Sequence, residues 1–177
     1  MPARRSVLRV GITELRRRPG TQRPVVVQTP IPGLAITAAQ VPDDADLAID
    51  LILESVEGTA ITARGTVGVP WVAECRRCLD VVSGTMVVEV REVYEVHPRD
   101  GETYPIDVDE IDLEPVVRDA VLLNLPISPL CRPDCEGPVP DDLPVILPGE
   151  LPASEGDDGP PKDPRWAVLD GLTFDPP

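Results

Sequence analysis

The stretch "DLAIDLILESVEG" at residues 46–58 decides the fold class of this chain. Leu47, Ile49, Leu51 and Leu53 occupy one face in alternation, and Ala48, Asp50, Ile52 and Glu54 lie on the other. Successive side chains of a β-strand point to opposite faces of the sheet. Alternation over this length therefore predicts a strand with one buried face and one exposed face.

The sequence on either side continues the pattern. "TAITARGTVGVPWVAECRRC" (59–78) and "TMVVEVREVYEVHP" (85–98) alternate in the same way, and the valine run "PVVVQT" (24–29) is typical of a strand. In the last of the long stretches the side expected to be buried consists of Met86, Val88, Val90, Tyr94 and Val96. Short connections between such strands favour an antiparallel meander. The segment 7–18, "VLRVGITELRRR", fits either a strand or a short helix.

One main helix is predicted at "DLEPVVRDAVLLNLP" (112–126). Asp112 suits the N-cap, Glu114 suits the first turn, and Pro126 ends the helix. An apolar stripe at helical spacing consists of Leu113, Val116, Val117, Ala120, Val121 and Leu125. Because this stripe needs an apolar partner, we expect the helix to pack on the sheet. The predicted fold class is α+β, with an antiparallel sheet or a partly closed barrel packed with one main helix.

Composition divides the chain into three parts. Residues 1–135 are expected to form a single α+β domain that includes a basic N-terminal segment, 1–24. Proline, glycine and acidic residues dominate 136–161, which predicts a disordered linker because its apolar surface is too small to offset the entropy of ordering. The closing residues 162–177 contain "KDPRWAVLDGLTF", which predicts a short C-terminal docking helix.

The charge of the chain is unevenly distributed. Residues 1–24 contain seven arginines and one acid, whereas residues 25–177 contain 9 basic and 30 acidic residues, a net charge of −21. An acidic body repels phosphate backbones and attracts basic proteins. Contact with RNA or another partner is therefore expected to involve the N-terminal arginines Arg4, Arg5, Arg16, Arg17, Arg18 and Arg23.

No feature of the sequence indicates a membrane or a secretory route. No apolar run approaches the roughly 20 residues that span a bilayer. The N-terminus also lacks the apolar core of about 7–15 residues that a secretory signal needs, although its arginines leave a transit peptide open. We expect a cytoplasmic protein, and in that compartment paired cysteines more often bind metal or do redox work than form disulfides.

The four cysteines form two closely spaced pairs. Cys75 and Cys78 form a C-x2-C pair after a predicted strand, and Cys131 and Cys135 form a C-x3-C pair after the predicted helix. Four thiolates are the ligand set of a closed, tetrahedral structural zinc site. If the helix packs on the sheet, both loops can meet at one end of the domain. One structural zinc held there would brace the fold and would leave no open position for catalysis.

Two other interpretations of these cysteines stay open. They could be reduced structural thiols without metal, since the distance between the pairs is not a common zinc-finger spacing. A redox C-x-x-C pair is the other alternative, but such a pair usually opens a helix beside a parallel sheet, which nothing here indicates. In the zinc interpretation, Arg76, Arg77 and Arg132 would offset the charge of a dianionic four-thiolate centre.

No other motif indicates catalysis. His97 is the only histidine and precedes Pro98 at a predicted strand end, where a surface position is expected. The acidic run "DVDEIDLE" (107–114) lacks the ligand-and-glycine pattern of a calcium loop and is expected to be a solvated turn. Since the sequence also lacks a phosphate-binding loop and a nucleophile motif, the protein is not expected to be an enzyme.

Four segments together carry a resemblance to a known family: "LRRRPGTQRPV" (15–25), "ECRRCLD" (74–80), "EIDLEPVVRDAVLLNLPISPLCRPDCEG" (110–137) and "DPRWAVLDGL" (163–172). With these segments the chain resembles the YceD-like family, known for accumulation of large-subunit ribosomal RNA. Many relatives in that family continue after the second cysteine pair with Gly-Leu-Cys-x-x-Cys-Gly, where this chain reads "EGPVPDDLPVI". Either the four cysteines complete a site alone, or the metal has been lost here.

The resemblance implies a non-enzymatic ribosome biogenesis factor that supports synthesis, processing or stability of 23S rRNA and the large ribosomal subunit. From the charge distribution we expect it to bind a basic large-subunit ribosomal protein or a pre-ribosomal particle, with the N-terminal arginines touching rRNA. The alternative is a zinc-stabilised protein–protein adaptor with no ribosomal role, whose segment "DPRWAVLDGL" is a ligand for a partner.

Overall fold

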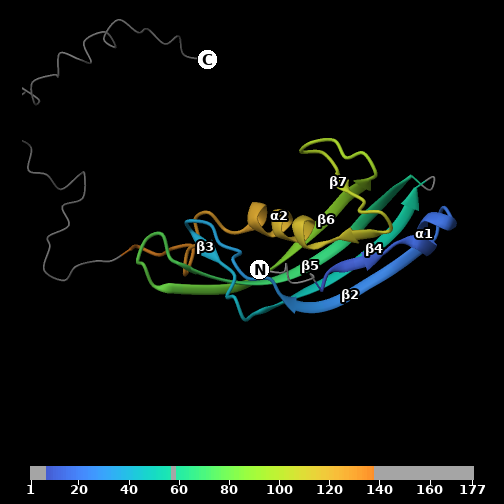
Figure 1. The fold of residues 1–177 in the computed structure, drawn as a ribbon. Helices are drawn as coiled ribbons and strands as arrows, with labels where there is room; N and C mark the ends of the chain where they lie inside the picture. The colour runs from blue at the N-terminus through green and yellow to red at the C-terminus, as the bar shows by residue number, and fades with distance from the viewer. Residues whose placement is uncertain (1–6, 57–58, 138–177) are drawn as a thin grey trace, which may run out of the picture. The chain divides into compact units, whose positions relative to one another are not determined.

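The computed structural model describes residues 7–56 and 59–137 (Figure 1). The elements in chain order are β1 (Arg9–Gly11), α1 (Thr13–Arg17), β2 (Gln22–Pro30), β3 (Ala39–Gln40), β4 (Asp46–Val56), β5 (Ala60–Glu74), β6 (Val81–Glu95), β7 (Tyr104–Pro105), β8 (Glu110–Asp112) and α2 (Glu114–Asn124). Of the predicted linker (136–161), only residues 136 and 137 are described, and the predicted C-terminal helix lies outside the described residues.

Six of the strands form one sheet with the order β2-β4-β5-β6-β7, and β3 pairs with β5 beside this path. β2, β4, β5 and β6 are antiparallel neighbours, so the expected meander is confirmed. β7 pairs with β6 in parallel, which makes the sheet mixed. The described strands form an open sheet, and the alternative of a partly closed barrel is therefore wrong for this part of the chain.

Alternation along the strands creates the core, as the sequence predicts. Leu47, Ile49, Leu51 and Leu53 of β4 are at most 1% exposed. Val88, Val90 and Tyr94 continue the buried face on β6. Val96, expected on the same face, is 45% exposed because β6 ends at Glu95 and the chain turns away.

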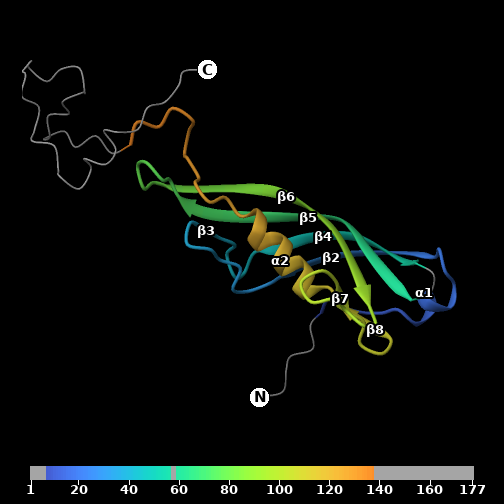
Figure 2. The ribbon, with the colours of Figure 1, turned by 90° about the horizontal axis from the view of Figure 1, so that it is seen from above.

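Helix α2 covers the buried face of the sheet, over β5 and β6 (Figures 1 and 2). Five of the six residues in its predicted apolar stripe are buried, and Ala120 is partly buried against the core. The helix begins one residue later than expected, with Leu113 at the N-cap position. Asp112 nevertheless caps it, since its carboxylate accepts a hydrogen bond from the Glu114 backbone N–H at 3.0 Å.

The segment 7–18, whose spacing fits either a strand or a short helix, contains both. β1 pairs with β8 in a separate two-stranded sheet, and α1 follows directly after it. Leu8, Val10, Ile12 and Leu15 bury their side chains in the main core, which ties this segment to the sheet. None of the helices in the described residues is long and apolar enough to cross a membrane.

Candidate metal centre

The first cysteine pair lies in the turn that connects β5 to β6. Cys75 donates its backbone N–H to the Asp80 carbonyl at 2.8 Å, and Leu79 donates to the Cys75 carbonyl at 3.0 Å. These two bonds fold residues 75–80 into a compact loop. Leu79 adopts a positive φ of 66°, which few non-glycine residues occupy. The C-x-x-C pair thus sits in a hairpin loop and does not open a helix, which removes the local support for a redox pair.

The second cysteine pair lies in the segment that follows α2, and hydrogen bonds hold this segment in place. Arg76 donates its backbone N–H to the Pro129 carbonyl at 2.9 Å, and the Arg77 guanidinium donates to the Cys135 carbonyl at 2.6 Å. Within the segment, Cys135 donates its N–H to the Arg132 carbonyl at 3.2 Å. The expectation that both loops meet at one end of the domain is confirmed.

The four sulfur atoms form a cluster with the dimensions of a tetrahedral site. Cys75 Sγ lies 3.8 Å from Cys135 Sγ, and Cys78 Sγ lies 3.6 Å from Cys131 Sγ. All four sulfurs lie within 4.8 Å of one another. Four sulfurs at about 2.3 Å from a central zinc would be separated by about 3.8 Å. Disulfide bonds need sulfurs at about 2.05 Å, so these contacts are between free thiols.

Hydrogen bonds to the sulfur of Cys75 also favour metal binding, because they favour its thiolate form. The backbone N–H of Cys78, and after it those of two neighbouring residues, lower the pKa of Cys75 to about 6. The side chain of Cys135 raises the pKa of Cys131. Because metal binding requires thiolates, N–H groups that already favour a negative sulfur lower the cost of assembling the site.

The four cysteines differ in burial. Cys75 and Cys135 are buried, Cys78 is half-buried, and Cys131 is exposed. For Cys78, the backbone N–H of Asp80 favours the thiolate, but burial and neighbouring side chains outweigh it and raise the pKa. A cation at the centre would remove this conflict, since it favours the deprotonated form of all four sulfurs. The residues present therefore fit one structural zinc.

The three arginines expected to offset the thiolate charge make other contacts. Arg77 contacts the Cys135 carbonyl, as described above, and Arg76 donates to the Ile127 carbonyl at 3.3 Å. Arg132 forms an exposed ion pair with Asp134 at 3.6 Å. Arg76 and Arg77 therefore stabilise the loops around the cluster, and their guanidinium groups bond to carbonyl oxygens beside it.

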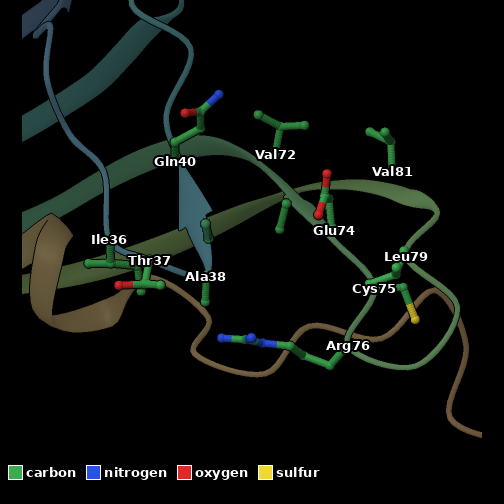
Figure 3. Close-up of a pocket in the computed structure, with 12 residues that line it drawn as sticks. Ile36, Thr37, Ala38, Gln40, Val72, Glu74, Cys75, Arg76, Leu79 and Val81 are labelled. Carbon is green, nitrogen blue, oxygen red and sulfur yellow. The ribbon is translucent and has the colours of Figure 1, made fainter.

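A pocket of 380 Å³ opens beside Cys75, between the chain before β3 and the loop that carries the first cysteine pair. Figure 3 shows Leu79 and Val81 on one side of it and Ile36 and Thr37 on the other. Apart from Glu74, Cys75 and Arg76, none of its lining residues carries an ionisable group. The pocket is therefore a cleft with a mixed polar and apolar lining next to the cysteine cluster.

The N-terminal arginines proposed for RNA or partner contact differ in their surroundings. Arg4 and Arg5 lie outside the described residues. Arg16 donates to the Val108 carbonyl at 2.9 Å and pairs with Asp109 at 3.3 Å. Arg23 donates to the Gly11 carbonyl at 2.7 Å. Arg17 and Arg18 are exposed, and within the described residues their side chains have no hydrogen-bond or ion-pair partner.

Sequence reasoning missed the role of the acidic run 107–114. It forms the β8 hairpin, where Asp107 accepts from and donates to Glu110 through their backbones at 2.9 Å. Arg9 lies within 3.5–3.9 Å of carboxylate oxygens of Asp107, Glu110 and Asp112. The sequence feature that could have predicted this contact is the opposite charge of Arg9 and the acidic run 107–114. His97 is exposed, as expected.

The fold and the cluster define a class of protein: a small, mostly β domain with one main helix and a four-cysteine cluster that joins two loops. Residues 63–173 match the family described as "Large ribosomal RNA subunit accumulation protein YceD". The chain belongs to this family, and the resemblance seen in the sequence is confirmed.

Similar proteins occur in mycobacteria. An uncharacterized protein of Mycobacterium tuberculosis is 39% identical over 178 residues, which cover 93% of this chain and 80% of that protein. An uncharacterized protein of Mycobacterium bovis shows the same values. One from Mycobacterium leprae is 35% identical over 137 residues, which cover 71% of this chain and 61% of that protein. No solved structure was found to match the chain.

Proposed function

We propose that this protein is a non-enzymatic ribosome biogenesis factor that supports synthesis, processing or stability of 23S rRNA by binding a basic large-subunit ribosomal protein. The observation that carries the proposal is the match of residues 63–173 to a family named for accumulation of large-subunit ribosomal RNA. The matched range contains most of β5, all of β6 and α2, and all four cysteines.

The charge of the described residues supports a basic protein as the partner. They carry 21 acidic and 12 basic side chains, a net charge of −9. Several of the arginines already lie in ion pairs, as Arg64 does with Glu54 and Arg118 with Glu114. The charged side chains that are not in ion pairs are therefore mainly negative. Such a surface attracts a cationic protein and steers its approach.

Direct contact with rRNA, where it occurs, would use the arginines that the fold leaves available. Arg17 and Arg18 are exposed, whereas Arg16 already contacts Asp109. The two available side chains lie at the end of α1, where phosphate oxygens can approach from solvent. Phosphate contacts of this kind position a protein on RNA without reading its sequence.

The cysteine cluster supports a structural role for a metal in this function. It joins the β5–β6 loop to the segment after α2, and a zinc ion bound by Cys75, Cys78, Cys131 and Cys135 would be coordinatively closed. Such a site holds the two loops in one arrangement and offers no position for a substrate. The metal would thus preserve the shape that the partner recognises.

Depletion of the protein tests the proposal. We expect depletion to lower the ratio of large-subunit to small-subunit rRNA and the wild-type chain to restore that ratio. An unchanged ratio would contradict the proposed function. Co-sedimentation of the tagged full chain provides a second readout: the proposal expects it with large-subunit particles, whereas stable recovery of an unrelated partner alone would favour the adaptor alternative.

A further inference from the structure

The two long edges of the main sheet are β2 and β6. β2 pairs only with β4. β6 pairs with β5 along its whole length, but on its other side it pairs only with β7, at Tyr94 and Glu95. Within the described residues, the outer side of β6 from Val81 to Val93 has no strand beside it (Figure 2).

The hydrogen bonds show which residues of β6 present their backbone groups at this edge. Cys75 donates to Asp80 across the start of the β5–β6 ladder, and the register continues from there without a bulge. Since bonded and non-bonded pairs alternate in an antiparallel ladder, the even-numbered residues bond to β5 and the odd-numbered residues point outward. At the far end, the Glu95 carbonyl accepts from Ile106 on the outer side, which agrees with this assignment.

The same reasoning applied to β2 shows that its edge is blocked. Ser55 donates to the Thr21 carbonyl, so the even-numbered residues of β2 point away from β4. Two of these outward positions are Pro24 and Pro30, which have no N–H to offer. Proline at outward edge positions is a common protection against unwanted strand pairing.

The edge of β6 lacks this protection. It contains no proline, and residues 81–88 contain no charged side chain. Among its outward residues, Val81, Thr85 and Val87 are exposed and have high β-propensity. An uncharged stretch of edge strand such as 81–88 pairs readily with another extended segment. Because the β2 edge is blocked and this stretch is not, the β6 edge is the one suited to a partner.

We propose that the outer edge of β6 binds an extended segment of a basic protein, which adds to the sheet as one more strand. Backbone bonds to residues 81–93 would provide the affinity, and apolar side chains of the segment would lie against Val81 and Val87. A cationic side chain would face Glu89 toward the other end of the strand. This inference rests on the proposed function and names the surface through which it acts.

Charge distinguishes the basic segment from a second copy of this chain. β6 carries three acids, Glu89, Glu92 and Glu95, of which Glu95 already pairs with Arg99 at 3.5 Å, and one arginine, Arg91. The whole chain has a formal net charge of −15, so two copies repel each other, whereas a cationic segment is attracted. A second copy is therefore the disfavoured occupant, and the experiment below detects it.

Two valines provide a matched pair of variants for the test. Val87 on β6 and Val26 on β2 are both 71% exposed, and both occupy outward positions of an edge strand. Val87→Pro removes one outward N–H and places a ring in the path of an added strand. Val26→Pro makes the same change at the edge that is already blocked. Comparison of the thermal unfolding of the two variants shows whether each still folds.

The full chain and both variants are immobilised and exposed to the proteins extracted from purified large ribosomal subunits. A basic protein retained by the wild type is then purified, and its dissociation constant is measured for each variant. We expect Val87→Pro to weaken binding by about tenfold or more and Val26→Pro to leave it unchanged. Val87→Lys, which repels a cationic segment without removing an N–H, should weaken binding more than Val26→Lys.

Hydrogen exchange of the complex locates the contact independently. Binding should slow amide exchange in peptides that cover 81–93 and leave β2 peptides unaffected. Wild-type-like binding by both Val87 variants, or protection elsewhere, would overturn this inference while leaving the proposed function standing. A different result would also overturn the inference: the chain captures no basic protein but associates with itself, and only Val87→Pro abolishes this self-association. The β6 edge would then bind a second copy of the chain. If the wild type retains no ribosomal protein, the binding step of the proposed function fails with it.

Discussion

At the scale of single residues, Gly65 shows how closely β4 and β5 approach each other. Its φ is +153°, and a Cβ atom added there would lie 2.1 Å from the Asp50 carbonyl oxygen and 2.9 Å from Leu51 Cα. Both obstacles are backbone atoms of the paired strand, which cannot rotate away. Gly65 is therefore required by close packing of the main chain, and no larger residue can replace it without moving β4.

Substitution of Gly65 by alanine tests this conclusion. We expect Gly65→Ala to lower the free energy of unfolding by about 2 kcal/mol or more, because it adds both backbone strain and a clash. Gly68→Ala is the control, since its Cβ would lie 3.4 Å from Ala48 Cβ, in ordinary contact. The control should change stability by about 0.5 kcal/mol or less. Equal urea denaturation midpoints for the two variants would contradict the assignment.

Tyr94 links the core to the start of α2 and makes stability depend on alkaline pH. Its hydroxyl donates to the Asp112 carbonyl at 3.0 Å, and burial raises its pKa. The folded state therefore holds a proton that the unfolded chain releases near pH 10, so the contribution of this residue is present below about pH 10 and is lost as the pH rises further.

We expect Tyr94→Phe to cost about 1 kcal/mol at neutral pH, because it removes this hydrogen bond. It should also flatten the loss of stability above about pH 10. Urea unfolding measured from neutral to alkaline pH checks both effects. Tyr104→Phe is the comparison, since burial and then the bond to Asp119 raise the pKa of Tyr104 too. An alkaline slope unchanged by Tyr94→Phe would show that Tyr94 does not carry the dependence.

At the scale of elements, the cysteine cluster connects the β5–β6 hairpin to the segment after α2. We expect the purified protein to contain about one zinc per chain and its melting temperature to fall when a chelator removes the metal. Cys135→Ser should abolish the bound zinc. Arg132→Ala should retain it, because the Arg132 guanidinium contacts only Asp134 within the described residues. Zinc content measured by elemental analysis separates these outcomes, and a zinc-free wild type would favour reduced structural thiols.

The elements that the sequence predicted well are those with strong local periodicity. The strands around 46–58 and 59–78 and the helix near 112–126 each bury one side in the expected pattern. Very short strands such as β3 and β7 have only two residues, too few to show a period. The pairing of β1 with β8 joins residues about 100 positions apart, and only tertiary contact decides it.

The candidate site was predictable to a similar extent. The spacing of the four cysteines indicated one cluster, and the structure brings their sulfurs together. The spacing did not show that Cys75 faces Cys135 while Cys78 faces Cys131, since that depends on how the loops are tied by Arg76 and Arg77. The sequence also did not show which N-terminal arginines would form ion pairs with the acidic run 107–114.

At the scale of the whole molecule, the net charge of −15 makes any contact with RNA dependent on a few exposed cations. Arg17 and Arg18 are the described arginines of the N-terminal segment whose side chains remain available. Each phosphate contact releases bound counterions, so the logarithm of the binding constant falls linearly with the logarithm of the salt concentration. The slope of that line therefore reports the number of phosphate contacts.

We therefore expect the joint replacement Arg17→Ala and Arg18→Ala to weaken binding to large-subunit rRNA and to reduce the salt slope by roughly one unit per arginine. Arg16→Ala should reduce the slope less, because Arg16 already contacts Val108 and Asp109. Filter binding to a large-subunit rRNA fragment at several salt concentrations provides the slopes. Identical slopes for the wild type and the double variant would mean that these arginines do not touch phosphate. RNA contact would then have to use the other arginines expected for it, such as Arg4 and Arg5, and without them the acidic body would act through its protein partner.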